Sequence, residues 1–413
     1  MAKQIYNYEI FTSKKEELEK IREKRAREKR IKIIVALVLF FGMAFVGYIL
    51  FNSRSDYYIY QKEEEIEDNA GASYEAFESG YLKYTNNGIE YQEPFGRSKW
   101  NVSISYAHPF LVTSDSYAVL GDKGENSLVL FDRKGKVKEL VFKYPLVQAT
   151  VSAQGITEVI LEGEGSNYIQ VYGKNGKMIA DMKSSVDETG YPVTAAISPD
   201  GTQLAVSYYS INAAETRTSV VFYDLSRQLQ SDDVTLKGGF DYKDTLIPKI
   251  SFMNDSTVAV FGNTATYFYN IKDEPRKKKE IHFEQEIQSI FENDKYVGYV
   301  MDNTQKPEDG KYEIMLFNRK GNRMLDCKLD MNYDFIKMWG NHIIATRDNE
   351  CTIINKRGNI LFQGKIEGDK IESVLPVRGW RTYQIVFRDR IVKMKLRFWK
   401  TGSRTKKAEQ TIY

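Results

Sequence analysis

The chain has 413 residues, of which 42% are hydrophobic and 28% are charged, so it can bury one large core or two small ones. Its net charge of +3 excludes a strong overall attraction to nucleic acid. Two cysteines, Cys327 and Cys351, are too few for a disulfide scaffold; they either pair across neighbouring repeats or remain separate packed thiols. The 28 tyrosines and 22 phenylalanines, with only 9 prolines, favour strands.

Residues 31–51 form an apolar segment that we predict to be one transmembrane helix. No residue from Ile33 to Phe51 is charged, and at ~1.5 Å of rise per residue such a run crosses a hydrocarbon core of roughly 30 Å. Lys and Arg dominate before the segment and acidic residues follow it, which predicts a cytoplasmic N-terminus and an extracytoplasmic C-terminal region at the plasma membrane. A cleaved signal peptide shows the same order, but the length of the run and the absence of a small-residue cleavage site favour an uncleaved signal anchor.

The flanking segments differ in composition. Residues 1–30 are predicted to be a basic cytoplasmic segment, helical over 13–30 where Glu and Lys or Arg recur four residues apart. It is either a topology signal or a helix that meets anionic lipid or a cytosolic partner. Residues 52–79 are expected to be an acidic extracytoplasmic linker, and residues 400–413 a disordered basic tail.

Between 80 and 399 the sequence repeats a strand, a basic glycine turn and a second strand. Clear copies read LVLFDRKGKVKELVF at 128–142, IMLFNRKGNRMLDCKL at 314–329 and CTIINKRGNILFQGKI at 351–366. A further strand precedes each unit, and seven such strands recur at about 40–50 residue spacing. This pattern predicts an all-β fold. It favours a seven-bladed β-propeller rather than one or two β-sandwiches. We expect the hairpin at 80–92 to complete the last blade and close the ring.

One segment, ISPDGTQLAVSYY at 197–209, resembles the strand-turn-strand of WD-repeat, quinoprotein-like and TolB-like propellers. The Trp-Asp and Gly-His pairs of true WD repeats and the regular tryptophans of quinoprotein dehydrogenases are absent. The whole layout is similar to single-pass propeller proteins of Gram-positive bacteria. That resemblance implies a membrane-anchored propeller and supplies no catalytic residues.

The sequence contains few residues that could support catalysis or metal binding, and they are not grouped in known motifs. His108, His282 and His342 lie in three different repeats without metal-ligand spacing. No nucleophile elbow, phosphate-binding loop or dinucleotide-binding glycine motif is present. The sequence therefore predicts no catalytic residue, cofactor or metal, although an enzyme stays open because several blades can contribute side chains to one channel.

The turns predict a polarised ring, because third-to-fourth and second-to-third strand connections lie on opposite faces of a propeller. The expected basic face comprises Arg133, Lys134, Lys136, Lys174, Lys177, Arg276, Lys277, Lys278, Lys279, Arg319, Lys320, Lys356 and Arg357. The expected acidic face comprises Asp122, Glu125, Glu162, Glu164, Asp302, Glu308, Asp309, Asp348 and Glu350. The basic face either engages anionic lipid or wall polymer, or its residues only fill tight turns.

These observations favour a non-catalytic, extracytoplasmic interaction scaffold for cell-envelope proteins or anionic envelope polymers. A receptor that binds a small ligand or glycan in the central channel and signals through the cytoplasmic helix is the alternative. Aromatic residues at the channel mouth would favour the receptor, and a channel filled by Val and Ala would favour the scaffold. An envelope hydrolase or lyase would need two converging carboxylates. Nucleic acid is not expected as a partner, since the basic clusters lack interleaved aromatics.

Overall fold

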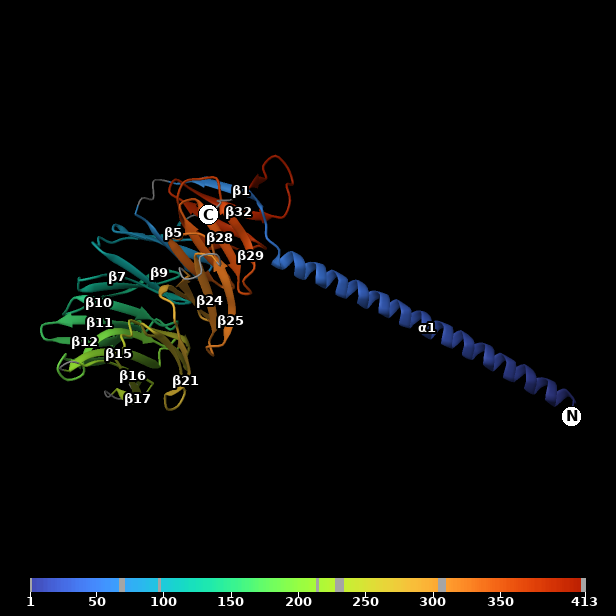
Figure 1. Cartoon of the computed structure of the whole chain (residues 1–413), viewed down its shortest axis with the longest axis horizontal. Coiled ribbons are helices and arrows are strands. Elements are labelled where there is room, and N and C mark those ends of the chain that lie inside the picture. Colours follow the sequence, from blue (N-terminus) through green and yellow to red (C-terminus); the bar gives the residue numbers. More distant parts are fainter. Residues whose placement is uncertain are drawn as a thin grey trace. The chain divides into compact units, whose positions relative to one another are not determined.

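The structure is a computed structural model that describes residues 2–66, 71–95, 98–212, 215–226, 234–303 and 310–409. The chain divides into two compact units, Met1–Arg54 and Ser55–Tyr413. The first unit contains α1 (Ala2–Asn52), which includes the predicted helix over 13–30 and the predicted membrane segment (Figure 1). Within the described part of the chain, its stretch Lys29–Asn52 is the one helix long and apolar enough to cross a membrane, a property that a signal sequence shares.

The second unit is a β-propeller whose described residues form eight sheets, numbered here as blades 1 to 8. Each of the first seven blades has four antiparallel strands in chain order. Blade 1 contains β2 (Ser73–Phe77), β3 (Gly80–Thr85), β4 (Gly88–Gln92) and β5 (Ser98–Ser103). Blade 2 contains β6 (Pro109–Thr113), β7 (Tyr117–Asp122), β8 (Ser127–Asp132) and β9 (Gly135–Val141). Blade 3 contains β10 (Leu146–Val151), β11 (Thr157–Gly163), β12 (Ser166–Tyr172) and β13 (Met178–Ser184).

The remaining blades follow the same order along the chain. Blade 4 contains β14 (Tyr191–Ile197), β15 (Gln203–Asn212), β16 (Glu215–Asp224) and β17 (Thr235–Lys243). Blade 5 contains β18 (Lys249–Asn254), β19 (Thr257–Phe261), β20 (Ala265–Asn270) and β21 (Arg276–His282). Blade 6 contains β22 (Ile287–Glu292), β23 (Tyr296–Asp302), β24 (Tyr312–Asn318) and β25 (Arg323–Leu329). Blade 7 contains β26 (Phe335–Trp339), β27 (His342–Arg347), β28 (Glu350–Asn355) and β29 (Ile360–Lys365). Blade 8 combines β30 (Ile371–Pro376), β31 (Thr382–Phe387) and β32 (Arg390–Arg397) with β1 (Tyr57–Glu65) and β33 (Lys406–Lys407).

The prediction of seven blades is wrong, because the described strands make eight. The hairpin at 80–92 was expected to complete the last blade, but its strands β3 and β4 are the second and third strands of a separate blade 1. The fourth strand of blade 8 is β1, which pairs antiparallel with β32 from Tyr57 opposite Arg397 to Glu65 opposite Arg390. Figure 1 shows blue β1 beside β32, so N-terminal and C-terminal strands do share one sheet, as expected.

Two predicted boundaries also change. The segment 52–79, expected to be a linker, contains β1 and β2, so the propeller begins before residue 80. The tail expected at 400–413 contains β33, which pairs with β1, and Ala408 is buried and donates its backbone N–H to the Asp56 carbonyl (2.9 Å). Residues 410–413 lie outside the described part of the chain.

Apolar layers between neighbouring blades hold the ring together. The second strands are buried on both faces, so alternate residues of one strand contact different neighbours: Leu120 of β7 packs towards blade 1, whereas Val119 packs towards blade 3. The layer between blades 8 and 1, which closes the ring, includes Tyr74, Tyr81 and Val386. This burial explains why the second strands read as continuous apolar runs.

Connections within a blade alternate between two faces of the ring. First-to-second and third-to-fourth connections lie on one face, and second-to-third connections lie on the other. Ser55, the first residue of the propeller unit, is on the former face, because its N–H donates to the Leu361 carbonyl at the start of β29 (2.8 Å). We call this the proximal face and the opposite one the distal face.

Candidate functional site

Most of the predicted basic residues do lie on the proximal face, in third-to-fourth connections. They are Arg133 and Lys134 after β8, Lys174 and Lys177 after β12, Arg319 and Lys320 after β24, and Lys356 and Arg357 after β28. Lys136 is already within β9, where its ammonium pairs with Glu139 (2.7 Å). The structure therefore spreads these residues around the outer rim of one face.

Acidic partners from other connections neutralise part of this rim. Arg133 of blade 2 approaches the Glu93 carboxylate of blade 1 at 3.5 Å. In blade 6, Arg319 donates to the Asp294 carbonyl (2.5 Å), and its guanidinium lies 3.3 Å from the Asp294 carboxylate. Each exposed pair contributes only about 0–1 kcal/mol, but these arginines are less available to an external anion.

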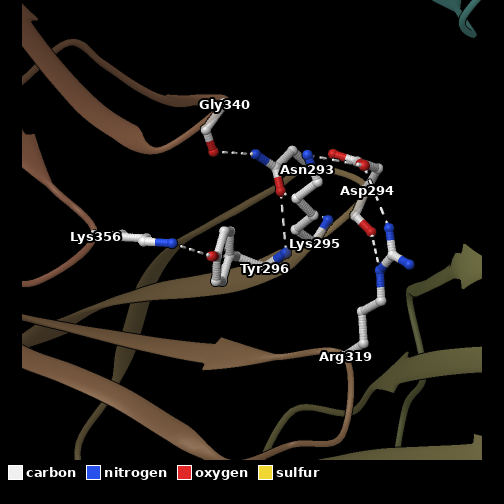
Figure 2. A network of polar contacts seen from close by, with 7 residues as sticks. All are labelled: Asn293, Asp294, Lys295, Tyr296, Arg319, Gly340 and Lys356. Carbon is white, nitrogen blue, oxygen red and sulfur yellow. Dashed lines mark hydrogen bonds and ion pairs between the residues drawn. The ribbon is translucent and has the colours of Figure 1, made fainter.

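Figure 2 shows the polar contacts at the junction of blades 6 and 7. Lys356 donates to the Tyr296 hydroxyl (3.2 Å), and the Asn293 side-chain amide donates to the Gly340 carbonyl (2.8 Å). The Asn293 oxygen in turn accepts from the backbone N–H of Tyr296 (3.0 Å), which fixes the turn. These contacts tie two blades together on the proximal face, so at this junction the basic residues have structural roles.

The cluster Arg276–Lys279 was expected in a turn, but it lies within β21, the outermost strand of blade 5. Lys277 pairs with Glu280 (2.6 Å) and lies 5.6 Å from the centre of the Tyr267 ring. Lys279 donates to Asn322 of blade 6 (3.3 Å). Lysines on an edge strand prevent pairing with strands of other molecules, so the location supports the structural interpretation of this cluster.

Those of the predicted acidic residues that the structure describes lie on the distal face but differ in accessibility. Asp122 is buried and accepts the backbone N–H groups of Ala107 (2.7 Å) and His108 (2.6 Å), and Glu350 is also buried. The exposed members are Glu125, Glu162, Glu164 and Asp348, with Asp302 half-buried at the end of β23. Glu308 and Asp309 lie outside the described residues. An exposed acidic surface thus remains, smaller than the sequence predicts.

Carboxylates also occur on the proximal face, and the sequence interpretation missed them. Asp115, Asp200, Asp255 and Asp294 occupy first-to-second connections near the channel. Asp255 accepts the backbone N–H of Asp200 from the preceding blade (2.9 Å). In blades 2, 4, 5 and 6 the proximal face is therefore acidic towards its centre, and its rim is basic. The aspartate that precedes the second strand in blades 2, 4, 5 and 6 could have revealed this arrangement.

The central channel contains two cavities. The larger, of about 570 Å³, is lined by first strands of blades 2 to 6, with Ala149, Val151 and Ala195 in its wall and a Lys249–Glu292 ion pair (2.9 Å) beside it. The smaller, of about 250 Å³, lies among blades 1, 7 and 8. It has Tyr74 and Trp339 in its wall and an ion pair between Glu75 and Lys337. The channel thus combines an aliphatic part with an aromatic part.

A buried carboxyl group is found outside these cavities. Glu158 of β11 is fully buried, and one of its oxygens accepts the Thr150 hydroxyl (3.0 Å), whereas the other has no partner among the described atoms. Burial raises the pKa of Glu158 to about 8, so the carboxyl is largely protonated at neutral pH. In the described ranges, no group of three or more His, Cys, Asp or Glu is arranged to hold a metal ion.

Comparison with protein families assigns most of the chain to one of them. Residues 52–396 match a family of unknown function, DUF5711. The chain belongs to that family. The match begins at residue 52 and therefore includes β1, the strand that closes the ring. No curated protein matches the sequence.

Solved structures with a similar fold are remote in sequence. BamB from Moraxella catarrhalis is 12% identical, with a TM-score of 0.48, and the alignment covers 82% of this chain and 100% of BamB. AztD from Citrobacter koseri is 11% identical, with a TM-score of 0.48 and coverage of 72% and 87%. Hydrazine synthase from Kuenenia stuttgartiensis is 10% identical, with a TM-score of 0.47 and coverage of 71% and 98%. At these values the likeness says nothing about activity.

Proposed function

We propose that this member of DUF5711 is a single-pass membrane protein that presents its propeller outside the cytoplasmic membrane as a non-catalytic interaction scaffold. The observation that carries the anchor is the exposed apolar surface of α1, where Phe41 and Met43 are 65% and 69% exposed. At about 25 cal/mol per Å² of apolar surface, so long an uncovered run is strongly unfavourable in water and favourable in lipid. The basic residues before it orient the N-terminus towards the cytoplasm.

The scaffold role is supported by the closed ring and its charged faces. A propeller closed by β1 is a rigid platform on which turns can vary without loss of the core. The exposed acidic residues of the distal face are a candidate surface for an envelope protein with basic residues. The basic rim of the proximal face is a candidate surface for anionic lipid or polymer.

Crosslinked co-purification from the native membrane tests the scaffold. The full chain is compared with a chain shortened after Arg54, where the propeller unit begins. A scaffold predicts defined envelope proteins that are recovered only with the full chain. Their loss on changing Glu125, Glu162 and Glu164 to Lys, but not on changing the exposed lysine Lys136 of β9 to Glu, would assign them to the distal face. Recovery of the same proteins with the shortened chain would contradict the proposal.

The smaller channel cavity supports a second candidate, a receptor for a small ligand. Its aromatic wall and the Glu75–Lys337 pair provide stacking and polar contacts in one recess. The Tyr74 hydroxyl is buried without a hydrogen-bond partner among the described residues, so a ligand could satisfy it. A screen of envelope sugars by thermal shift tests this candidate. A shift seen with the unaltered protein and lost in Lys337→Met would support the receptor, and no shift with any sugar would leave the scaffold as the better account.

A further inference from the structure

Two loops of blade 8 expose aromatic side chains together on the proximal face. Trp380, between β30 and β31, is 51% exposed, and Trp399, after β32, is 61% exposed. The Phe398 ring joins them, with its centre 5.8 Å from that of Trp380 and 5.9 Å from that of Trp399. We call Trp380, Phe398 and Trp399 the aromatic patch. The other two tryptophans pack inside the propeller: Trp100 stacks on Phe131, and Trp339 packs against the layer between blades 7 and 8.

The patch is held beside the residue through which the chain enters the propeller. The Arg381 guanidinium lies 4.7 Å from the centre of the Phe398 ring and 5.3 Å from that of Trp380. The same guanidinium donates to the hydroxyl of Ser55 (2.7 Å), which is fully buried. Ser55 follows Asn52, the last residue of α1, by three residues. At ~3.5 Å per extended residue, the covalent connection is at most about 10 Å long.

The charged residues on the two loops that carry the patch are all basic. Arg378, Lys400 and Arg404 are exposed on the same two loops, and no Asp or Glu occurs in 377–381 or 398–405. Tryptophan is enriched at membrane interfaces because its ring is amphipathic, and each cation near an anionic leaflet contributes about 1 kcal/mol. The headgroup layer is roughly 5–8 Å thick on each side of the hydrocarbon core, which is within the reach of the short connection.

We propose that the aromatic patch and its surrounding cations bind the lipid headgroup layer of the membrane that holds α1. The contact is made by the blade 8 part of the proximal face, and the distal face stays accessible to soluble partners. This inference rests on the proposed anchor, since without α1 in the membrane nothing would keep the patch within reach of the headgroup layer. Lipid is favoured over a wall polymer because the connection is too short to carry the patch beyond the headgroups.

Tryptophan quenching in proteoliposomes tests the inference. The full chain is reconstituted in phosphatidylcholine and phosphatidylglycerol vesicles that carry a nitroxide label on the headgroups. Since two of the 4 tryptophans belong to the patch, we expect quenching of about half of the emission. The double variant Trp380→Ser/Trp399→Ser should lose most of this quenching, whereas the matched control Trp339→Phe should retain it.

The cations are tested separately with all tryptophans intact. Vesicles of phosphatidylcholine alone lack anionic headgroups and should give weaker quenching. In the variant Arg378→Gln/Lys400→Gln/Arg404→Gln, quenching in the mixed vesicles should fall to this weaker level. Carbonate washing of the same vesicles reports the anchor. If the chain resists carbonate but its emission is not quenched, or is quenched equally in the double variant, the patch does not bind lipid, and the proposed anchor still stands. Release of the chain by carbonate overturns the anchor and the inference with it.

Discussion

The side chain of Tyr58 tests how strongly β1 closes the ring. Tyr58 is 2% exposed in the layer between blades 7 and 8, and its ring meets that of Phe362 edge to face at 6.1 Å. Its hydroxyl accepts the backbone N–H of Glu367 (2.8 Å). Removing a buried aromatic ring costs about 3–5 kcal/mol, and the hydrogen bond adds about 0.5–1.5 kcal/mol. We therefore expect Tyr58→Ala to destabilise the propeller by about 3.5–6.5 kcal/mol.

The assay is urea unfolding of the full chain in detergent, followed by tryptophan emission. A unit of this size can unfold in stages, so transition midpoints are compared at constant slope. Tyr58→Phe isolates the hydroxyl and should cost about 1 kcal/mol. Tyr57→Ala is the matched control, because Tyr57 is the adjacent, half-buried residue on the other side of the same strand. If Tyr58→Ala lowers the midpoint no more than Tyr57→Ala, closure by β1 does not contribute to stability as argued.

Three further predictions concern buried groups. The pKa of Glu158 is about 8 in the folded chain and near 4.5 in the unfolded chain, so its stabilising contribution is complete below pH 4.5 and is lost as pH rises through 8. Between these two pH values, Glu158→Gln should remove a pH dependence of the unfolding free energy of about 1.4 kcal/mol per pH unit. A variant whose urea midpoint depends on pH as the unaltered protein's does would contradict this. Cys327 and Cys351 are free thiols whose pKa burial raises to about 12, so iodoacetamide should modify them only after unfolding, and mass spectrometry that finds a disulfide would refute it. Gly298→Ala would place a methyl group against the Phe291 ring and should cost about 1–3 kcal/mol, against a small effect for Gly402→Ala, which meets open space.

The strands that the sequence reveals most clearly are those that are buried on both faces. Second strands such as β7 and β19 read as largely apolar runs because each packs against two neighbouring blades. The segment that contains β1 reads as a linker because the second half of this strand, Lys62–Glu65, is charged. In the folded chain this half pairs with β32, where Glu63 lies 3.0 Å from the Arg390 guanidinium. A partner more than 300 residues away in sequence could not be inferred from local composition.

The charged faces show a similar limit. Strand order alone predicts that the third-to-fourth turns share one side of the ring, and Arg133 and Arg319 lie in two of these turns. Whether such a charge is available depends on what approaches it from elsewhere, here Glu93 and Asp294. Those contacts follow from blade packing and not from the spacing of residues. The aromatic patch was missed because Trp380 and Trp399 come together only through the loops of blade 8.

The measurement that tests the central claim most directly is the intact mass of the protein isolated from its native membrane, combined with protease treatment of cells whose outer layers have been removed. A membrane-anchored propeller predicts a chain that retains α1, resists carbonate extraction and loses its C-terminal domain to external protease. A carbonate-soluble chain that begins after Asn52 would show that α1 is a cleaved signal sequence and would contradict the account.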